Sequence, residues 1–141
     1  MAFTGNYTCD VFKVGLMSGD FNFASGTADQ YKLALYTNTA TLDNTTTAYT
    51  TTEKVVASGY TAGGSLITPT LNSTYGTTYL DFDDVSWSAI ITARGALIYK
   101  VGGSDTAMFV LDFGADKTST TTFQVTFPVA SSTTSLVRLS T

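Results

Sequence analysis

The chain contains no histidine and only one cysteine, Cys9. Without histidine it lacks the side chain best suited to proton transfer near neutral pH and the commonest protein ligand of transition metals. A lone cysteine can form neither a disulfide within the chain nor a thiolate metal cage. These absences exclude triad-type catalysis, and we expect a protein that is not an enzyme and binds no cofactor.

Charged residues are also scarce, at 13% of the chain against roughly 25% in typical soluble domains. No two of the seven basic residues are adjacent, and the net charge is −4. Phosphate backbones are bound by clusters of Lys and Arg, so we expect no nucleic-acid partner. No apolar run approaches the length of a membrane span, and the N-terminus lacks the pattern of a signal peptide. These features predict a protein made in the cytoplasm with no membrane contact.

Hydroxylated residues dominate what is present, with 28 Thr and 13 Ser among 141 residues. Thr is β-branched, which suits a pleated sheet and disfavours long helices. A chain of this length, 43% hydrophobic, can bury one self-supporting core. The composition therefore predicts a single all-β domain spanning residues 1–141.

One short helix is predicted near the N-terminus, over about residues 9–17. Cys9, Phe12 and Leu16 recur at helical spacing, Thr8 is a candidate N-cap, and Gly19 is a natural stop. In this helix Cys9 is expected to pack as an apolar side chain rather than to react.

The rest of the chain alternates short apolar or β-branched runs with clusters of Gly, Asn, Asp, Ser and Thr, which predicts about nine strands. The runs are Tyr31–Thr37, Lys54–Ala57, Ser65–Thr70, Thr77–Phe82, Val85–Thr92, Ala96–Val101, Ala107–Phe113, Thr122–Phe127 and Leu136–Ser140. The even spacing favours a β-sandwich or jelly roll with one short N-terminal helix. In the first run, Tyr31, Leu33 and Leu35 share one face and Lys32 and Tyr36 the other, which predicts a strand with one buried face.

Two irregular segments are predicted. The polar stretch from Thr37 to Thr52 is expected to be a long surface loop, with a possible helical turn at Thr47–Thr51. At Asp83–Asp84 the apolar face changes parity, which indicates a bulge or a bend where the chain passes between sheets.

The nearest grouping of acids is Asp81, Asp83 and Asp84. The simplest interpretation is a solvated strand edge whose negative charge opposes unwanted pairing. Calcium binding is the alternative, although no regular ligand spacing supports it. Trp87 follows Val85 at strand period and is expected in the core.

Arg94 is the one basic residue in an otherwise apolar segment. The default prediction is a structural ion pair with Asp112 or Asp81, and the alternative is a salt bridge to a neighbouring subunit.

Four aromatic residues gather near the N-terminus without strong alternation: Phe3, Tyr7, Phe21 and Phe23. Aromatic side chains carry much of the energy of protein interfaces. With Arg94, these four are the candidate contacts with another subunit, and residues 1–25 are the arm expected to make them.

Six segments in their order along the chain resemble a family of small tailed-phage virion structural proteins, some of which are similar to capsid cement (decoration) proteins. These segments are FKVGLMSGDFNF, YKLALYT, TTAYTTTEKVVASGYTAGG, YLDFDDVSWS, ITARGALIYK and VLDFGADKTS. Together they cover more than half of the chain, and their combined order is more specific than any one of them.

The resemblance implies a β-sandwich or jelly-roll body that binds the assembled head shell and stabilises it. The implied partners are the major capsid protein and further copies of the chain, as a dimer or trimer, on the outside of the capsid. Two alternatives stay open: a tail or head-to-tail joining component of the virion, and a carbohydrate-binding or adhesion module. No catalytic residue follows from the resemblance.

Overall fold

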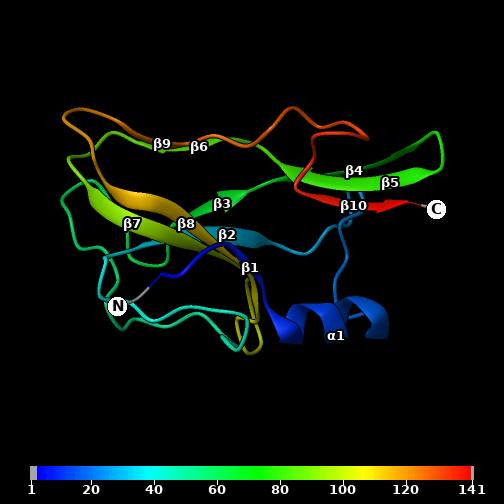
Figure 1. Ribbon diagram of the computed structural model, residues 1–141, viewed down its shortest axis with the longest axis horizontal. Helices are drawn as coiled ribbons and strands as arrows, with labels where there is room; N and C mark the ends of the chain where they lie inside the picture. Colours follow the sequence, from blue (N-terminus) through cyan, green and yellow to red (C-terminus); the bar gives the residue numbers. More distant parts are fainter. Residues whose placement is uncertain (1–2, 141) are drawn as a thin grey trace.

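The computed structural model describes residues 3–140 of the chain as a β-sandwich with one short helix (Figure 1). The helix is α1 (Asp10–Ser18), and the strands are β1 (Tyr7–Thr8), β2 (Tyr31–Tyr36), β3 (Ser65–Ile67), β4 (Pro69–Thr74), β5 (Thr77–Phe82), β6 (Val85–Trp87), β7 (Thr92–Lys100), β8 (Ala107–Thr118), β9 (Phe123–Val125) and β10 (Val137–Ser140). The all-β prediction with one N-terminal helix is confirmed.

The strands form two layers. One is a five-stranded antiparallel sheet of order β1-β8-β7-β2-β3. The other is divided between a three-stranded sheet, β10-β5-β4, and a two-stranded sheet, β6-β9. In Figure 1 this divided layer lies above the five-stranded sheet, and α1 lies beneath its β10 end.

Aromatic side chains fill the space between the layers. Tyr31 from the five-stranded sheet meets Phe82 from β5 with ring centroids 5.8 Å apart, and Phe82 meets Phe127 at 6.1 Å. Trp87 is 6% exposed and packs edge-on against Tyr60, so its predicted place in the core is confirmed. Edge-to-face arrangements of this kind add to the energy of burial.

Helix α1 lies one residue from its predicted position. Cys9 occupies its N-cap position but makes no side-chain cap, and Thr8, the expected cap, belongs to β1 instead. Gly19 ends the helix with φ 82°, and its N–H donates to the carbonyl of Gly15. A left-handed residue at this position is typical of helix ends and favours glycine. This helix is too short to cross a membrane, and no other helix occurs between residues 3 and 140.

Strand β2 is buried on both faces, and the prediction of half burial is therefore wrong. Its second face is covered by the loop between β2 and β3. Tyr49 of this loop stacks at 4.8 Å on Tyr99 of β7, and the Tyr36 hydroxyl donates to the carbonyl of Thr50 at 2.6 Å. A strand between two packed layers has no solvent face, so the alternation seen in its sequence carries no information about exposure.

The loop prediction for Thr37–Thr52 is confirmed, but no helical turn forms at Thr47–Thr51; Ala48 instead makes a single bridge to Thr106. The predicted strand Lys54–Ala57 is reduced to isolated bridges, one of them to Tyr36.

Other strand boundaries also shift. The run Ser65–Thr70 divides into β3 and β4, which belong to different sheets, and the run Val85–Thr92 ends at Trp87. Strands β7 and β8 are longer than predicted, and β1 was not predicted.

The corner at Asp83–Asp84 is confirmed as the point where the chain passes from the three-stranded to the two-stranded sheet. Asp83 Oδ1 accepts from the Thr68 N–H at 2.6 Å, and Asp84 Oδ1 accepts from the Phe127 N–H at 2.7 Å. These side chains therefore satisfy backbone donors that the interrupted ladders leave free.

Candidate binding groove

A groove of about 540 Å³ separates α1 and β8 from the C-terminal strand β10. Its apolar lining comes from Phe12 and Leu16, one turn apart on α1, and from Phe109, Leu136 and Val137. Residues i and i+4 of a helix lie on one face, which places both α1 side chains toward the sheet.

The groove continues as a narrower hollow of about 60 Å³ beneath the three-stranded sheet. Leu71 of β4 and Leu139 of β10 line this part, and they are 46% and 61% exposed. Apolar side chains that remain this exposed beside a concave surface are typical of sites that bind another protein.

Two basic side chains lie at the groove, although the chain carries a net charge of −4. Lys13 pairs with Asp10 at 2.8 Å, and the Arg138 guanidinium donates to the carbonyl of Thr133 at 2.7 Å. The guanidinium of Arg138 forms no ion pair within residues 3–140. The groove thus combines an apolar floor with a positive rim.

Of the residues predicted to contact another subunit, only Phe23 lines the groove, in its narrower part, and most are engaged within the chain. Phe3 is 1% exposed, and its ring fills the space beside Gly95 of β7. Tyr7 lies in β1, and its hydroxyl is 2.6 Å from Oγ1 of Thr4. Phe3 therefore belongs to the core of the chain, and its selection as an exposed anchor is wrong.

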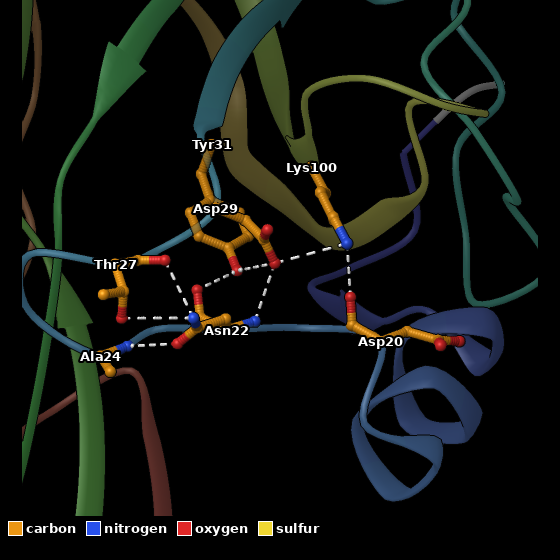
Figure 2. Close-up of polar contacts among 7 residues, drawn as sticks. All are labelled: Asp20, Asn22, Ala24, Thr27, Asp29, Tyr31 and Lys100. Carbon is orange, nitrogen blue, oxygen red and sulfur yellow. Dashed lines mark hydrogen bonds and ion pairs between the residues drawn. The ribbon is translucent and has the colours of Figure 1, made fainter.

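Phe21 and Phe23 lie in the connection between α1 and β2, which a polar network holds in one shape (Figure 2). Asn22 is its centre: its N–H donates to Asp29 Oδ2 at 2.8 Å, and its carbonyl accepts from the Tyr31 hydroxyl at 2.8 Å. Lys100 pairs with the same Asp29 oxygen at 3.3 Å and also donates to the carbonyl of Asp20.

This network positions the two Phe rings against the chain itself. Phe23 is 6% exposed and stacks on Tyr31 with centroids 4.9 Å apart. Phe21 is partly exposed, packs edge-on against Phe12 at 4.9 Å, and lies under the Lys100 ammonium. Phe23 is thus a core residue and not a free anchor, and only Phe21 keeps part of its ring at the surface.

Arg94 forms the predicted ion pair with Asp112. Its Nε lies 2.9 Å from Asp112 Oδ1, and the two side chains are 20% and 11% exposed. The hydrogen bond from Arg94, with a further one from the Gly114 N–H, holds the pKa of Asp112 below its usual range. Since Arg94 is already paired, its default assignment is confirmed.

Asp81 departs from the prediction of a solvated acidic edge. It is 1% exposed, its Oδ1 accepts from the Phe82 N–H at 2.9 Å, and its Oδ2 has no hydrogen-bond partner within the described part of the chain. Burial raises the pKa of this carboxyl, because the charged form loses its hydration. No group of three or more His, Cys, Asp or Glu suited to a metal ion occurs within residues 3–140.

Cys9 behaves as predicted. Its side chain is fully buried, and burial raises the pKa of the thiol to about 11. A thiol in this state packs as part of the core, and almost none of it is deprotonated to the thiolate at neutral pH.

A second hollow, of about 470 Å³, lies between β8 and β9. Its lining mixes the Phe113 and Phe123 rings with Lys117, Gln124 and several Thr and Ser hydroxyls. In this hollow, aromatic rings and hydrogen-bonding side chains therefore lie side by side.

The sequence analysis did not find the groove. Leu71 lies in β4 beyond the predicted run Ser65–Thr70, and Leu139 and Arg138 lie in β10, where a strand was predicted but no binding surface. The available signal was the low charge of both segments, which is unusual for exposed edges.

Comparison of the chain with protein-family models, with curated proteins and with solved structures found no match in any of the three.

Proposed function

We propose that the chain is a non-catalytic structural protein of a tailed-phage virion, which binds the outside of the assembled head shell and stabilises it. The partner is the major capsid protein. The observation that carries the proposal is the groove between α1 and β10, with Leu71 and Leu139 exposed at its mouth.

A protein segment with apolar side chains and an acidic group fits this groove. Burying the exposed parts of Leu71 and Leu139 stabilises the complex by about 25 cal/mol for each Å² removed from water. Arg138, which has no acidic partner among residues 3–140, would then pair with the segment's carboxylate. The net charge of −4 favours the outer surface of the shell over the side that faces packaged nucleic acid.

Such a protein acts by mass action. If it binds the assembled lattice and not the free subunits, the free energy of each contact is added to the stability of the shell. Many bound copies of the protein, each with a contact of modest free energy, then stabilise one particle. The role requires shape and surface chemistry, with no catalytic group.

The test has two parts. Mass spectrometry of purified particles from the phage that encodes the chain should find it in hundreds of copies if it coats the head. Particles that lack it should then regain full occupancy with wild-type protein and lose it with Leu139→Asp, which puts a charge into the apolar groove. Val129→Asp is the matched control, because Val129 is 83% exposed and lies outside the groove.

Equal occupancy by the Leu139→Asp variant would reject the groove as the shell contact. Tens of copies or fewer would assign the chain to the tail or to the head-to-tail joint instead.

The hollow between β8 and β9 favours a second candidate, a carbohydrate-binding or adhesion module. Phe113 offers a ring face and Lys117 and Gln124 offer hydrogen bonds, which is a common combination at sugar sites. Binding to a glycan array that is lost in Phe113→Ala, together with absence of the chain from purified capsids, would support this candidate.

A further inference from the structure

Strand β4 is the longest open edge without a charge in the described part of the chain. It has six residues, PTLNST, and pairs only with β5. The four residues from Thr70 to Ser73 are all exposed. Natural sheets protect exposed edges with charges, bulges or very short strands, because an open edge can pair with another strand.

The other open edges are protected in these ways. Strand β10 carries Arg138, and the part of β8 beyond its pairing with β1 carries Asp112, Asp116 and Lys117. The remaining edges are only two or three residues long. Strand β4 has only Pro69, at its start.

The hairpin between β4 and β5 determines which backbone groups of β4 face outward. Tyr75 and Gly76 connect the strands with φ of 52° and 77°, the two positive values of a type I′ turn. In such a hairpin the flanking pair, Thr74 and Thr77, is hydrogen-bonded, and hydrogen-bonded pairs then alternate along the ladder.

By this alternation Thr70 and Asn72 bond to β5, whereas Leu71 and Ser73 direct their N–H and C=O groups outward. Two hydrogen bonds agree with this assignment. Thr68 lies two residues before Thr70, so its backbone groups point to the same side, and its carbonyl accepts from the Asp83 N–H at 3.1 Å. The Ser73 N–H, lacking a strand partner, donates to the Asn72 side chain at 2.8 Å.

We infer that β4 is a self-association edge, at which a second copy of this chain pairs its own β4 in antiparallel fashion across a two-fold axis through Asn72. In this register Leu71 of each copy lies opposite Ser73 of the other. All the outward N–H and C=O groups of these two residues gain partners. Pro69, which has no N–H, falls at the end of this register, opposite the hairpin tip, where the ladder stops.

Two features favour a second copy over an unrelated strand. An edge without charge pairs with itself at no electrostatic cost, whereas self-pairing of β10 about Arg138 would place like charges together. The register also brings Tyr75, which is 97% exposed, opposite Pro69 of the second copy. An aromatic residue held at positive φ on a hairpin tip is strained, and such strain is typical of contact residues.

The pairing does not depend on what the groove binds. It joins the two β10-β5-β4 sheets into one continuous sheet at the edge opposite β10, and it uses the backbone of Leu71, whose side chain lines the narrower part of the groove. The closest side-chain pair on the axis is Asn72 with Asn72 of the second copy, because non-hydrogen-bonded pairs approach most closely.

Sedimentation equilibrium of the full chain over a wide concentration range tests the inference. Wild type should form dimers. Asn72→Lys, which places two ammonium groups opposite each other, should raise the dimer dissociation constant by about tenfold or more. Val129→Lys is the matched control: it adds the same charge at a position that is 83% exposed and lies outside β4 and the groove, and its dimer should equal that of wild type.

A charge exchange tests the two-fold register. Asn72→Lys and Asn72→Glu should each be monomeric alone, and their equal mixture should restore dimers. Tyr75→Asn should stabilise the monomer, since Asn tolerates positive φ, and at the same time weaken the dimer. Opposite changes in stability and association cannot come from a purely structural role.

Three results would overturn the inference: a wild-type chain that stays monomeric throughout, an Asn72→Lys variant that associates like wild type, or a mixture that does not restore dimers. Binding of an extended peptide to β4 of a monomeric wild type would likewise reject the second copy as the occupant.

Discussion

The ring of Phe3 occupies the space that a side chain on Gly95 would fill. The carbonyl of Leu111 closes the same space at 2.5 Å from the ideal Cβ position. Phe3 thereby fastens the start of the chain to β7 and β8, and only glycine allows this approach.

Replacement of either residue should reduce the stability of the fold. We expect Phe3→Ala to lower the free energy of unfolding by about 3–5 kcal/mol, and Gly95→Ala by about 1–3 kcal/mol. Urea denaturation measures both. Tyr7→Phe is the control and should change stability by less than about 0.5 kcal/mol. A Phe3→Ala variant of unchanged stability that no longer binds the shell would restore Phe3 as an interface residue.

Asp81 should make the protein less stable as the pH rises. Its pKa in the folded state is raised above the unfolded value of 3.8, so the native state holds the proton more tightly. The favourable contribution is complete below pH 3.8 and is lost as the pH increases through the raised pKa. Asp81→Asn, which stays neutral, should therefore gain stability over wild type between acidic and neutral pH. Thermal unfolding at a series of pH values measures this difference, and a constant difference at every pH would contradict it.

The ion pair of Arg94 and Asp112 should have the opposite dependence. The pKa of Asp112 is lowered in the folded state, so its contribution is present above pH 3.8 and is lost as the pH falls through the lowered pKa. Arg94→Met should cost about 1–2 kcal/mol at neutral pH and progressively less in acid. Lys13→Met removes the far more exposed pair with Asp10 and should change little at either pH. A cost for Arg94→Met that does not depend on pH would assign the effect to packing alone.

Cys9 should be unreactive until the fold opens. The thiol is fully buried and its pKa is raised to about 11, so a maleimide should label it only at a rate set by unfolding, which urea increases. The control is Val129→Cys in a Cys9→Ala background, where the thiol is exposed and should react at once. Rapid labelling of native wild type would show that the N-terminus of α1 opens independently of the rest.

The sequence predicted the elements that depend on local chemistry. The helix followed from Phe12, Leu16 and Gly19, and β5 followed from the run that begins after Gly76. The corner at Asp83–Asp84 followed from a change of parity. Each of these signals lies within a few residues of the feature that it specifies.

Features that depend on distant partners could not be predicted in this way. Strand β1 exists only because Tyr7 and Thr8 meet β8, about a hundred residues later. Asp81 was assigned to a solvated edge because nothing near it in sequence reveals the burial of its carboxyl. The groove likewise needs α1 and β10, from opposite ends of the chain, to come together.

The pairing of Tyr7 with Val110 also sets the order in which the chain can fold. On the ribosome β1 and β2 emerge long before β8 and β7, so neither can join its sheet until most of the protein has been made. Closing such large loops is slow, and β1 and β2 stay without these partners until the late strands arrive. The small size of the domain therefore does not by itself predict fast folding, because its central sheet joins segments about a hundred residues apart.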